Sequence, residues 1–320
     1  MAMSGHEPLR IGISSCLLGQ HVRFDGGHKR DAFLVDTFGA FVEWVPVCPE
    51  VELGLGTPRE ALRLVRAGDL VRMVNTKSRR DITDEMRRWA RSRVEALAGE
   101  GLAGYVLKKD SPSCGMERVK VYGESGMADK SGRGLFAEAL MERFPRLPVE
   151  EEGRLSDPRL RDNFVERVFA YVRLRALFRP RWTAGDLVRF HTAHKMALLA
   201  HSPAMYADLG RLVAQAKTLD RAGLESRYRN LFMDALAKMA TARRHTNVLQ
   251  HMAGHFKDLL DADEKQELLG SIEDYRLGLV PLVVPLTLIK HHVRRHKVAY
   301  LAGQVYLDPH PKELMLRNHV

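Results

Sequence analysis

Cysteine is scarce in this chain of 320 residues, which has only three, Cys16, Cys48 and Cys114. A small odd number argues against a disulfide framework and favours a reducing, cytoplasmic location. Long hydrophobic runs are also lacking, because Pro281, Pro285 and Lys290 interrupt the longest of them, so no membrane span is expected. The first residues, MAMSGHEPLR, lack the apolar core of a signal peptide.

Acidic charge is in short supply in the second half of the chain. Residues 1–155 hold 24 Lys and Arg against 23 Asp and Glu, whereas residues 156–320 hold 26 against 17 and 11 of the 14 histidines. The net charge of +10 is therefore concentrated in the second half, which predicts that any polyanionic partner binds there. Basic surfaces also occur without such a partner, so a purely solvated basic surface stays open at this point.

What is present is a soluble composition, 45% hydrophobic and 28% charged, in a chain long enough for two domains. Short apolar runs at residues 11–15, 41–47 and 104–107 predict buried strands in residues 1–150. We therefore expect an α/β domain with an open, mostly parallel, Rossmann-like sheet there. Residues 151–158 end a stretch rich in proline and glutamate and are interpreted as a linker. Helix-period segments then fill an all-α domain at 159–320.

Each of the three predicted strands stops at or just before a cysteine. The carboxyl ends of parallel strands share one edge of a sheet, and ligands bind at that edge. Cys16, Cys48 and Cys114 are therefore predicted to converge on one crevice. The third cysteine lies in VLKKDSPSCGM (residues 106–116), where Pro112 forces a turn and two lysines are expected to favour the thiolate.

Three widely separated cysteines admit two kinds of metal site. Zinc held by three thiolates is one, although the usual paired CxxC spacing is absent. A cubane iron–sulfur cluster with one iron left without a protein ligand is the other. Such an iron would accept a soft sulfur ligand, and the polar neighbours then acquire roles. Glu50 and Asp25 are candidate bases, Ser111 or Ser113 a substrate-positioning or proton-relay group, and Lys108 a donor to a developing anion.

Two weaker patterns lie elsewhere. Ser131, Gly132, Arg133 and Gly134 precede a predicted helix over 135–144, an arrangement suited to a phosphate and equally to a plain helix entry. In the second half, basic clusters predict RNA phosphate contacts by Arg243, Arg244, Lys290, Arg294, Arg295 and Lys297, against the alternative of a solvated helix face. His251 and His255 have metal-binding spacing, but the zinc-protease glutamate is missing.

The segments SSCLLGQHVRFDGGHK, PVCPEVELGLGTPR and LKKDSPSCG resemble the thiouracil desulfidase (TudS-type) family over about the first 150 residues. The second half, from HTAHKMALLAHSP onward, is similar to the helical domain often fused to it, so the whole resembles RudS-type tRNA 4-thiouridine desulfidases. The resemblance implies that Cys16, Cys48 and Cys114 hold a [4Fe-4S] cluster with one open iron. It also implies acid/base roles for Glu50 and Ser111, with Asp25 and Lys108 following.

The function predicted from this resemblance is non-redox hydrolysis of 4-thiouridine in thiolated tRNA to uridine and hydrosulfide. Two alternatives stay open: a desulfidase of free thiouracil or of thiopyrimidine nucleotides such as 4-thiouridine monophosphate, and a non-catalytic metal-containing RNA-binding protein. The sequence carries no signal for the oligomeric state, the tRNA position treated or the sulfur acceptor.

Overall fold

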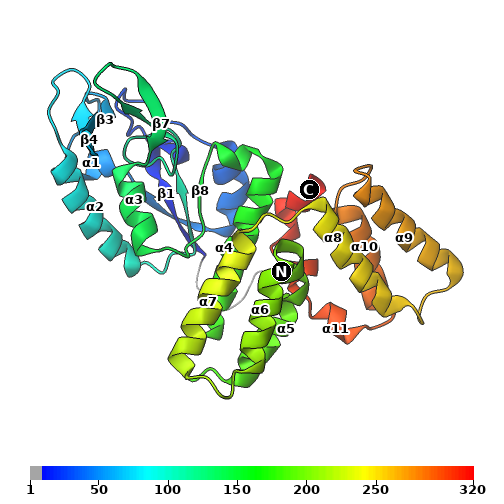
Figure 1. The fold of residues 1–320 in the computed structure, drawn as a ribbon. Helices are drawn as coiled ribbons and strands as arrows, with labels where there is room; N and C mark the ends of the chain where they lie inside the picture. The colour runs from blue at the N-terminus through cyan, green and yellow to red at the C-terminus, as the bar shows by residue number, and fades with distance from the viewer. Residues whose placement is uncertain (1–8) are drawn as a thin grey trace. The chain divides into compact units, whose positions relative to one another are not determined.

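The structure, a computed structural model, describes residues 9–320, and the chain divides into two units, Met1–Ser156 and Asp157–Val320 (Figure 1). The first is the predicted α/β domain and the second the predicted all-α domain. Among the described residues, no helix has the length and apolar character needed to cross a bilayer.

Sheet A carries the carboxyl-terminal edge that the sequence predicted. Its strands are β1 (Arg10–Ser14), β2 (Glu43–Val47), β5 (Gly104–Leu107) and β8 (Val149–Glu151), in the order β2-β1-β5-β8, and all three pairings are parallel. The chain leaves β1 toward β2 on one side and returns to β5 on the other. This reversal of direction creates the kind of crevice in which open α/β sheets bind ligands.

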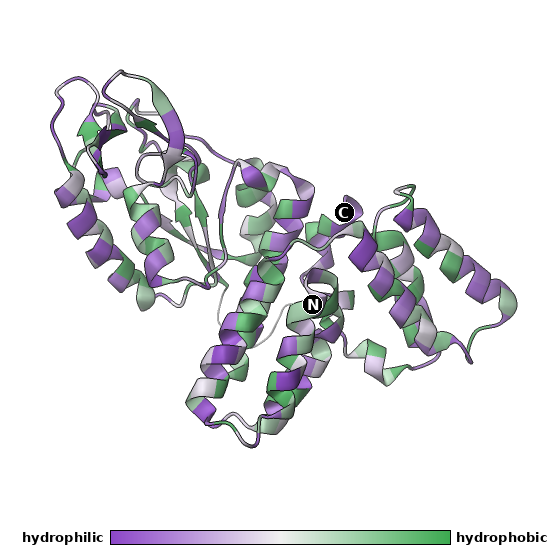
Figure 2. Cartoon of the chain, viewed as in Figure 1, coloured by the Kyte–Doolittle hydropathy of each residue, from purple (hydrophilic) through white to green (hydrophobic). Residues whose placement is uncertain are grey.

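Two helices, α2 (Thr83–Ala98) and α3 (Leu135–Arg143), pack side by side against the sheet (Figure 1). Trp89 of α2 contacts Phe136 of α3, whose ring lies 5.8 Å from that of Tyr105 on β5. A Cβ on Gly12 of β1 would fall 2.1 Å from the Tyr105 ring, so only glycine permits this packing. Figure 2 shows hydrophobic residues along these central strands and mixed faces along the helices.

A second, mixed sheet, which includes the strand β6 (Val119–Tyr122), was not predicted. Sheet B has the order β4-β3-β6-β7, with β3 (Leu62–Ala67) and β4 (Leu70–Asn75) forming a hairpin and β7 (Ala128–Gly132) pairing antiparallel to β6. Leu64, Met73 and Val121 join residues of α2 in a small core beneath it. Arginines interrupt the apolar alternation of the hairpin, and this hides it in the sequence.

The expected linker at residues 151–158 needs correction, because Glu151 is the last residue of β8. Glu150 and Glu151 are buried: Glu150 accepts from Arg154 Nε at 2.6 Å and Glu151 from Met116 N at 2.8 Å. These partners explain how a glutamate-rich segment joins a sheet. Between β1 and β2, the chain forms a short π-helix (Phe33–Thr37) followed by a 3-10 helix (Phe38–Phe41).

The second unit is helical throughout its described length. Its longer helices are α4 (Pro158–Leu177), α5 (Ala184–His201), α6 (Pro203–Ala214), α7 (Arg221–Ala237), α8 (Ala242–Ala253), α9 (Ala262–Arg276) and α10 (Val283–Arg295). Side-chain caps define several starts: Asp157, Thr183, Ser202, Asp220, Thr241 and Asp261 each accept a backbone N–H of the following first turn. A short helix, α11 (Ala299–Ala302), and 3-10 turns follow.

Several buried histidines of the second unit form hydrogen bonds within its helical core. His201 of α5 holds Glu166 of α4 at 3.4 Å through Nε2 and the Lys238 carbonyl at 2.6 Å through Nδ1. Burial alone would lower the pKa of His201, but the Glu166 carboxylate beside it raises that pKa above its ordinary value. His201 and Arg317 in turn outweigh burial and lower the pKa of Glu166.

Replacing Glu166 with Gln should destabilise the helical unit by about 3–5 kcal/mol, because it leaves His201 and Arg317 buried without their counter-charge. The effect of the pair is fully present between the unfolded pKa values of Glu and His, and it fades as pH rises through the raised pKa of His201. Chemical denaturation of wild type and variant across pH measures it.

Asp208→Asn is the matched control, because Asp208 pairs with Arg211 on the surface of α6 and should cost less than about 1 kcal/mol. Equal losses in the two variants would show that the buried network contributes nothing special.

Candidate active site: a three-cysteine crevice

All three cysteines line one cavity of about 360 Å³ at the carboxyl end of sheet A. Each is a free, buried thiol, and each follows a different strand of the sheet: Cys16 follows β1, Cys48 follows β2 and Cys114 follows β5. The predicted convergence is thus present in the geometry. Besides the cysteines, the cavity is lined by cationic side chains, by Glu50 and by Ser111.

Cys16 sits in a one-turn 3-10 helix, Ser15–Leu18, directly after β1. Its carbonyl accepts the N–H of Gly19 at 3.3 Å and that of Lys29 at 2.9 Å, which fixes the loop that returns over the cavity. Gly19 has φ +89°, a left-handed conformation that favours glycine and reverses the chain here.

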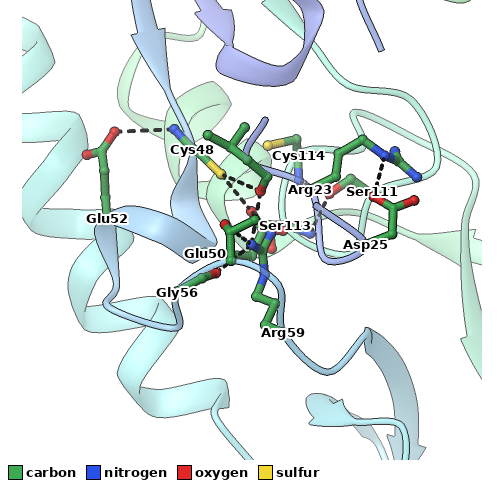
Figure 3. A network of polar contacts seen from close by, with 12 residues as sticks. Arg23, Asp25, Cys48, Glu50, Glu52, Gly56, Arg59, Ser111, Ser113 and Cys114 are labelled. Atoms are coloured by element: carbon green, nitrogen blue, oxygen red, sulfur yellow. Dashed lines mark hydrogen bonds and ion pairs between the residues drawn. The ribbon is translucent and has the colours of Figure 1, made fainter. Parts of the chain in front are cut away.

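Cys48 is the N-cap of a short helix, α1 (Pro49–Glu52), and its N–H donates to Glu52 Oε1 at 3.3 Å. Glu52 also receives Arg93 Nε of α2 at 2.8 Å, which ties the cysteine turn to the helical layer. The Cys48 thiol lies 3.5 Å from Glu50 Oε2, and Arg59 Nη2 lies 3.7 Å from that same oxygen (Figure 3).

Cys114 is positioned by the loop that the sequence singled out. Ser111 Oγ accepts the N–H groups of Ser113 at 3.2 Å and of Cys114 at 3.1 Å, and Gly115 N donates to the Ser111 carbonyl at 2.8 Å. Asp110 adopts φ +59° as the chain turns into this loop. A Cβ on Gly115 would lie 2.3 Å from Val119, so the turn is closed tightly against sheet B.

Residues 131–134, predicted as a phosphate loop, do not line the cavity. Gly134 N donates to the Gly115 carbonyl, Leu135 N to Pro112, and Phe136 N and Ala137 N to Ser113. The first N–H groups of α3 therefore already have acceptors in the Cys114 loop. Ser131 and Gly132 belong to β7, and Arg133 Nε donates to the Met116 carbonyl at 2.9 Å.

Burial dominates the chemistry of the thiols. It raises the pKa of Cys16 to about 11 and of Cys48 to about 12, and it raises that of Cys114 strongly; the Glu50 carboxylate adds to the increase in all three. The expectation that lysines favour a Cys114 thiolate is thus wrong for the protein alone, because burial raises the pKa of this thiol and the Glu50 carboxylate adds to the increase. A cationic cofactor would be needed to hold these sulfurs as thiolates.

The donor set fits a cluster better than a single ion. Ligands of one zinc ion lie within about 4.6 Å of each other, twice the Zn–S distance. In residues 9–320, no three His, Cys, Asp or Glu side chains are grouped closely enough to hold one ion. Three thiols spread around one cavity match a cofactor that offers each cysteine a different iron. The buried Ser113 hydroxyl, which has no partner in the described structure, lies next to Cys114.

Of the two remaining predicted residues, Lys108 lines the cavity and Asp25 does not. Lys108 lines the cavity and its N–H donates to Ser14 Oγ at 2.9 Å. Asp25 does not line it: its side chain is 47% exposed and accepts the N–H of Gly27 at 3.0 Å, which, with Arg23, lowers its pKa. This carboxylate stabilises the turn over the cavity (Figure 3).

Sequence reasoning missed three residues of the cavity. Arg59, only 8% exposed, bridges Glu50 and the Val22 carbonyl, and Phe24 is a 43% exposed ring in the lining. Ser14 is the last residue of β1, and its hydroxyl accepts the N–H of Lys108, the residue that directly follows β5. Arg59 follows a proline in a glycine-rich stretch, so its charge was the available signal.

The predicted RNA-contact residues of the helical unit fall into two groups. Arg243, Arg294 and Lys297 are exposed. Arg244 Nη1 donates to the carbonyls of His201 and Met239, Lys290 pairs with Asp308, and Arg295 pairs with Glu264. His251 and His255 lie with ring centroids 5.7 Å apart, and His255 stacks on Tyr300.

The fold and the site define an α/β domain with a thiol-lined crevice, followed by a helical domain. A family model described as 2-thiouracil desulfurase matches residues 11–152, and the model of a protein of unknown function, DUF1722, matches residues 195–311. The chain therefore carries a domain of the 2-thiouracil desulfurase family followed by a DUF1722 domain.

Relatives cover different shares of the chain. An uncharacterized protein of Escherichia coli, YbgA, is 37% identical over 163 residues, which is 50% of this chain and 95% of YbgA. Bacillus subtilis YbbK, also uncharacterized, is 31% identical over 113 residues, 33% of this chain and 72% of YbbK. A solved structure of the [4Fe-4S]-dependent thiouracil desulfidase TudS is 33% identical and covers 46% of this chain and 93% of its own, with a TM-score of 0.38.

Gly134→Ala should disturb the cysteine loop, because the added Cβ would lie 2.4 Å from the Ser113 carbonyl group. We expect a loss of about 1–3 kcal/mol in the stability of the first unit, measured by denaturant unfolding. Gly210→Ala in α6 is the control, since a Cβ there has no neighbour within 4 Å and a mid-helix alanine should stabilise slightly. A Gly134 variant as stable as the control would mean that α3 and the loop are not packed as described.

Proposed function

We propose that the protein is a desulfidase that converts 4-thiouridine in tRNA to uridine. The C=S bond of the base is replaced by C=O, with the oxygen coming from water and the sulfur leaving as hydrosulfide, so no electron is gained or lost. The observation that carries this proposal is the meeting of Cys16, Cys48 and Cys114 in one cavity, in a chain of the 2-thiouracil desulfurase family.

The three cysteines would hold a [4Fe-4S] cluster and leave one iron without a protein ligand. When bound, such a cluster supplies a Lewis acid with a preference for sulfur. The protein supplies the rest of the site. A cavity of about 360 Å³ is of the size that encloses a small ligand, and it admits a pyrimidine ring.

Glu50 is the group best placed to take the proton of the attacking water. Its carboxylate is 12% exposed, lines the cavity and is held by Arg59 at 3.7 Å. Arg59 is itself fixed by the carbonyls of Val22 and Gly56, both at 2.9 Å from Nη1. Such an anchored carboxylate can accept a proton at one fixed point and return it to the departing sulfur.

Ser111 and Lys108 are donors in this arrangement. Because Ser111 Oγ already accepts two backbone N–H groups, its hydroxyl hydrogen is left to donate to the base or to Glu50. Lys108 Nζ, paired with Glu152, would interact with the developing negative charge. Phe24, exposed in the lining, offers a ring face on which a pyrimidine can stack.

The excess of basic residues beyond position 156 supports tRNA as the carrier of the base, because phosphate contacts dominate the affinity of such proteins for nucleic acid. The second candidate function, desulfidation of free thiouracil or 4-thiouridine monophosphate, is favoured by the small size of the cavity. A non-catalytic metal-containing RNA-binding protein is the third candidate.

Glu50→Gln should lower the rate of sulfide release from thiolated tRNA by about 10²–10⁴-fold, the range for losing a general acid/base. The assay uses anaerobically reconstituted protein, with iron and zinc content measured in parallel. Glu43→Gln is the control, since Glu43 is half exposed on β2 and contacts only Arg10 in the described ion pairs.

Full activity in the Glu50 variant at normal iron content would remove Glu50 from the mechanism. One zinc per chain with no iron, and no sulfide released by the wild type, would favour the RNA-binding protein instead.

Replacing Arg243, Arg294 and Lys297 together with Ala should raise KM for thiolated tRNA, because three exposed cations that can contact phosphates are lost. Each phosphate contact removed should also reduce the salt dependence of binding, by about one unit of the log–log slope. The wild-type rate on 4-thiouridine monophosphate is the reference. If wild-type protein treats the mononucleotide as efficiently as tRNA, the second candidate function is the better one.

A further inference from the structure

A second cavity, of about 400 Å³, lies in the helical unit where α4 ends and α5 begins. Its walls include three arginines, Arg173, Arg179 and Arg181, with Trp182 and Phe190. None of these residues belongs to the RNA contacts predicted from the sequence, and neither the cysteine cavity nor its proposed chemistry uses them. The concentration of guanidinium groups around one hollow indicates an anion as its ligand.

Arg173 is the central observation. Its Nη1 donates to the Pro309 carbonyl at 2.9 Å, but its Nε and Nη2 are buried and have no hydrogen-bond partner in the described structure. A buried charged donor without an acceptor is costly, and this cost is normally offset by a counter-ion or by hydrogen bonds. Consistent with it, burial lowers the pKa of Arg173 to about 10, and the Glu166 carboxylate, which is already paired with His201 and Arg317, only partly opposes this shift.

The turn between the helices presents the other two arginines. Arg179 and Arg181 are exposed, and Arg181 holds φ +73°, a conformation that is uncommon for a residue with a side chain. The next residue, Trp182, keeps the turn in place: its N–H donates to the Arg179 carbonyl at 3.2 Å and its Nε1 to Glu225 at 3.2 Å.

The one carboxylate in the lining, that of Asp186, is already engaged in capping α5. It accepts from Thr183 N at 2.8 Å and Thr183 Oγ1 at 2.7 Å, and it pairs with Arg189. It therefore does not supply the missing acceptor to Arg173 in this structure. Two exposed guanidinium groups at the rim and one buried group in the wall are left to face the ligand.

We propose that this cavity binds a phosphate of the RNA backbone, with Arg173 donating from its wall and Arg179 and Arg181 from its rim. The proposal rests on the proposed tRNA substrate and adds a contact point to it. A guanidinium group can donate two parallel hydrogen bonds to two oxygens of one phosphate. Trp182 is buried and the Arg221 guanidinium lies over its ring, so this ring cannot stack on a base.

The test compares tRNA binding by the full chain, wild type against the double variant Arg179→Ala/Arg181→Ala, by fluorescence anisotropy across a salt series. We expect the Kd to rise about tenfold or more and the magnitude of the slope of log K against log salt to fall by about one, because one phosphate contact is lost. Arg211→Ala/Arg276→Ala is charge-matched and alters exposed arginines of α6 and α9, so it should change the Kd far less.

Arg173→Gln tests the buried group, with inorganic phosphate as the probe. Phosphate should raise the thermal unfolding midpoint of wild type above that in chloride at equal ionic strength, and this shift should be lost in the Arg173 variant. Because the rim variant leaves the core intact, the proposal stays testable if Arg173→Gln fails to fold.

The proposal is overturned if the rim variant binds tRNA as the charge-matched control does. In that case sulfide release from thiolated tRNA by the wild type still supports the proposed function. If wild-type protein binds no tRNA, the RNA substrate and this phosphate site fail together, and activity on 4-thiouridine monophosphate alone decides whether the protein is a desulfidase.

Discussion

The parallel pairing of β2, β1 and β5 is the constraint on which the site depends. Only equal polarity of these strands brings residues 16, 48 and 114 to one rim, since each cysteine follows the carboxyl end of its own strand. The contacts around them serve this placement: Glu52 ties Cys48 to α2, and the first N–H groups of α3 bind the Cys114 loop. The packing of α2 and α3 therefore also determines where the thiols lie.

Burying three thiols together would cost little while they stay neutral, and the raised pKa values keep them so. The same burial makes thiolates unfavourable until a cationic cofactor arrives, which couples cofactor binding to proton release. Glu50 next to Cys48 strengthens that coupling, while Arg59 and Lys108 limit the negative charge gathered in the cavity. The cationic side chains of the lining would offset the negative charge that three thiolates and Glu50 bring to the cavity.

The sequence predicted the parallel sheet, the all-α second unit and the meeting of the cysteines, because all three follow from periodicity and strand polarity. The hairpin of β3 and β4 was missed because arginines interrupt its alternation of apolar and polar residues. Strand β8 was missed because it lies in a glutamate-rich stretch. Glu150 is buried beside Arg154, four residues along the chain, whereas Glu151 accepts from Met116 N, a distant partner that no local pattern encodes. Arg59 was missed for the same reason, since its partner Glu50 becomes its neighbour only in the folded loop.

Net charge indicated which half of the chain would contact a polyanionic partner, but it could not say which residues would do so. Arg244, Lys290 and Arg295 belong to dense basic clusters in the sequence, yet each is engaged by a carbonyl or carboxylate of its own unit. Arg173 shows the opposite case, because an arginine outside those clusters has buried guanidinium nitrogens without an acceptor in the described structure. A count of charges measures the long-range attraction to RNA, whereas the contacts themselves depend on which cations the fold leaves without an internal partner.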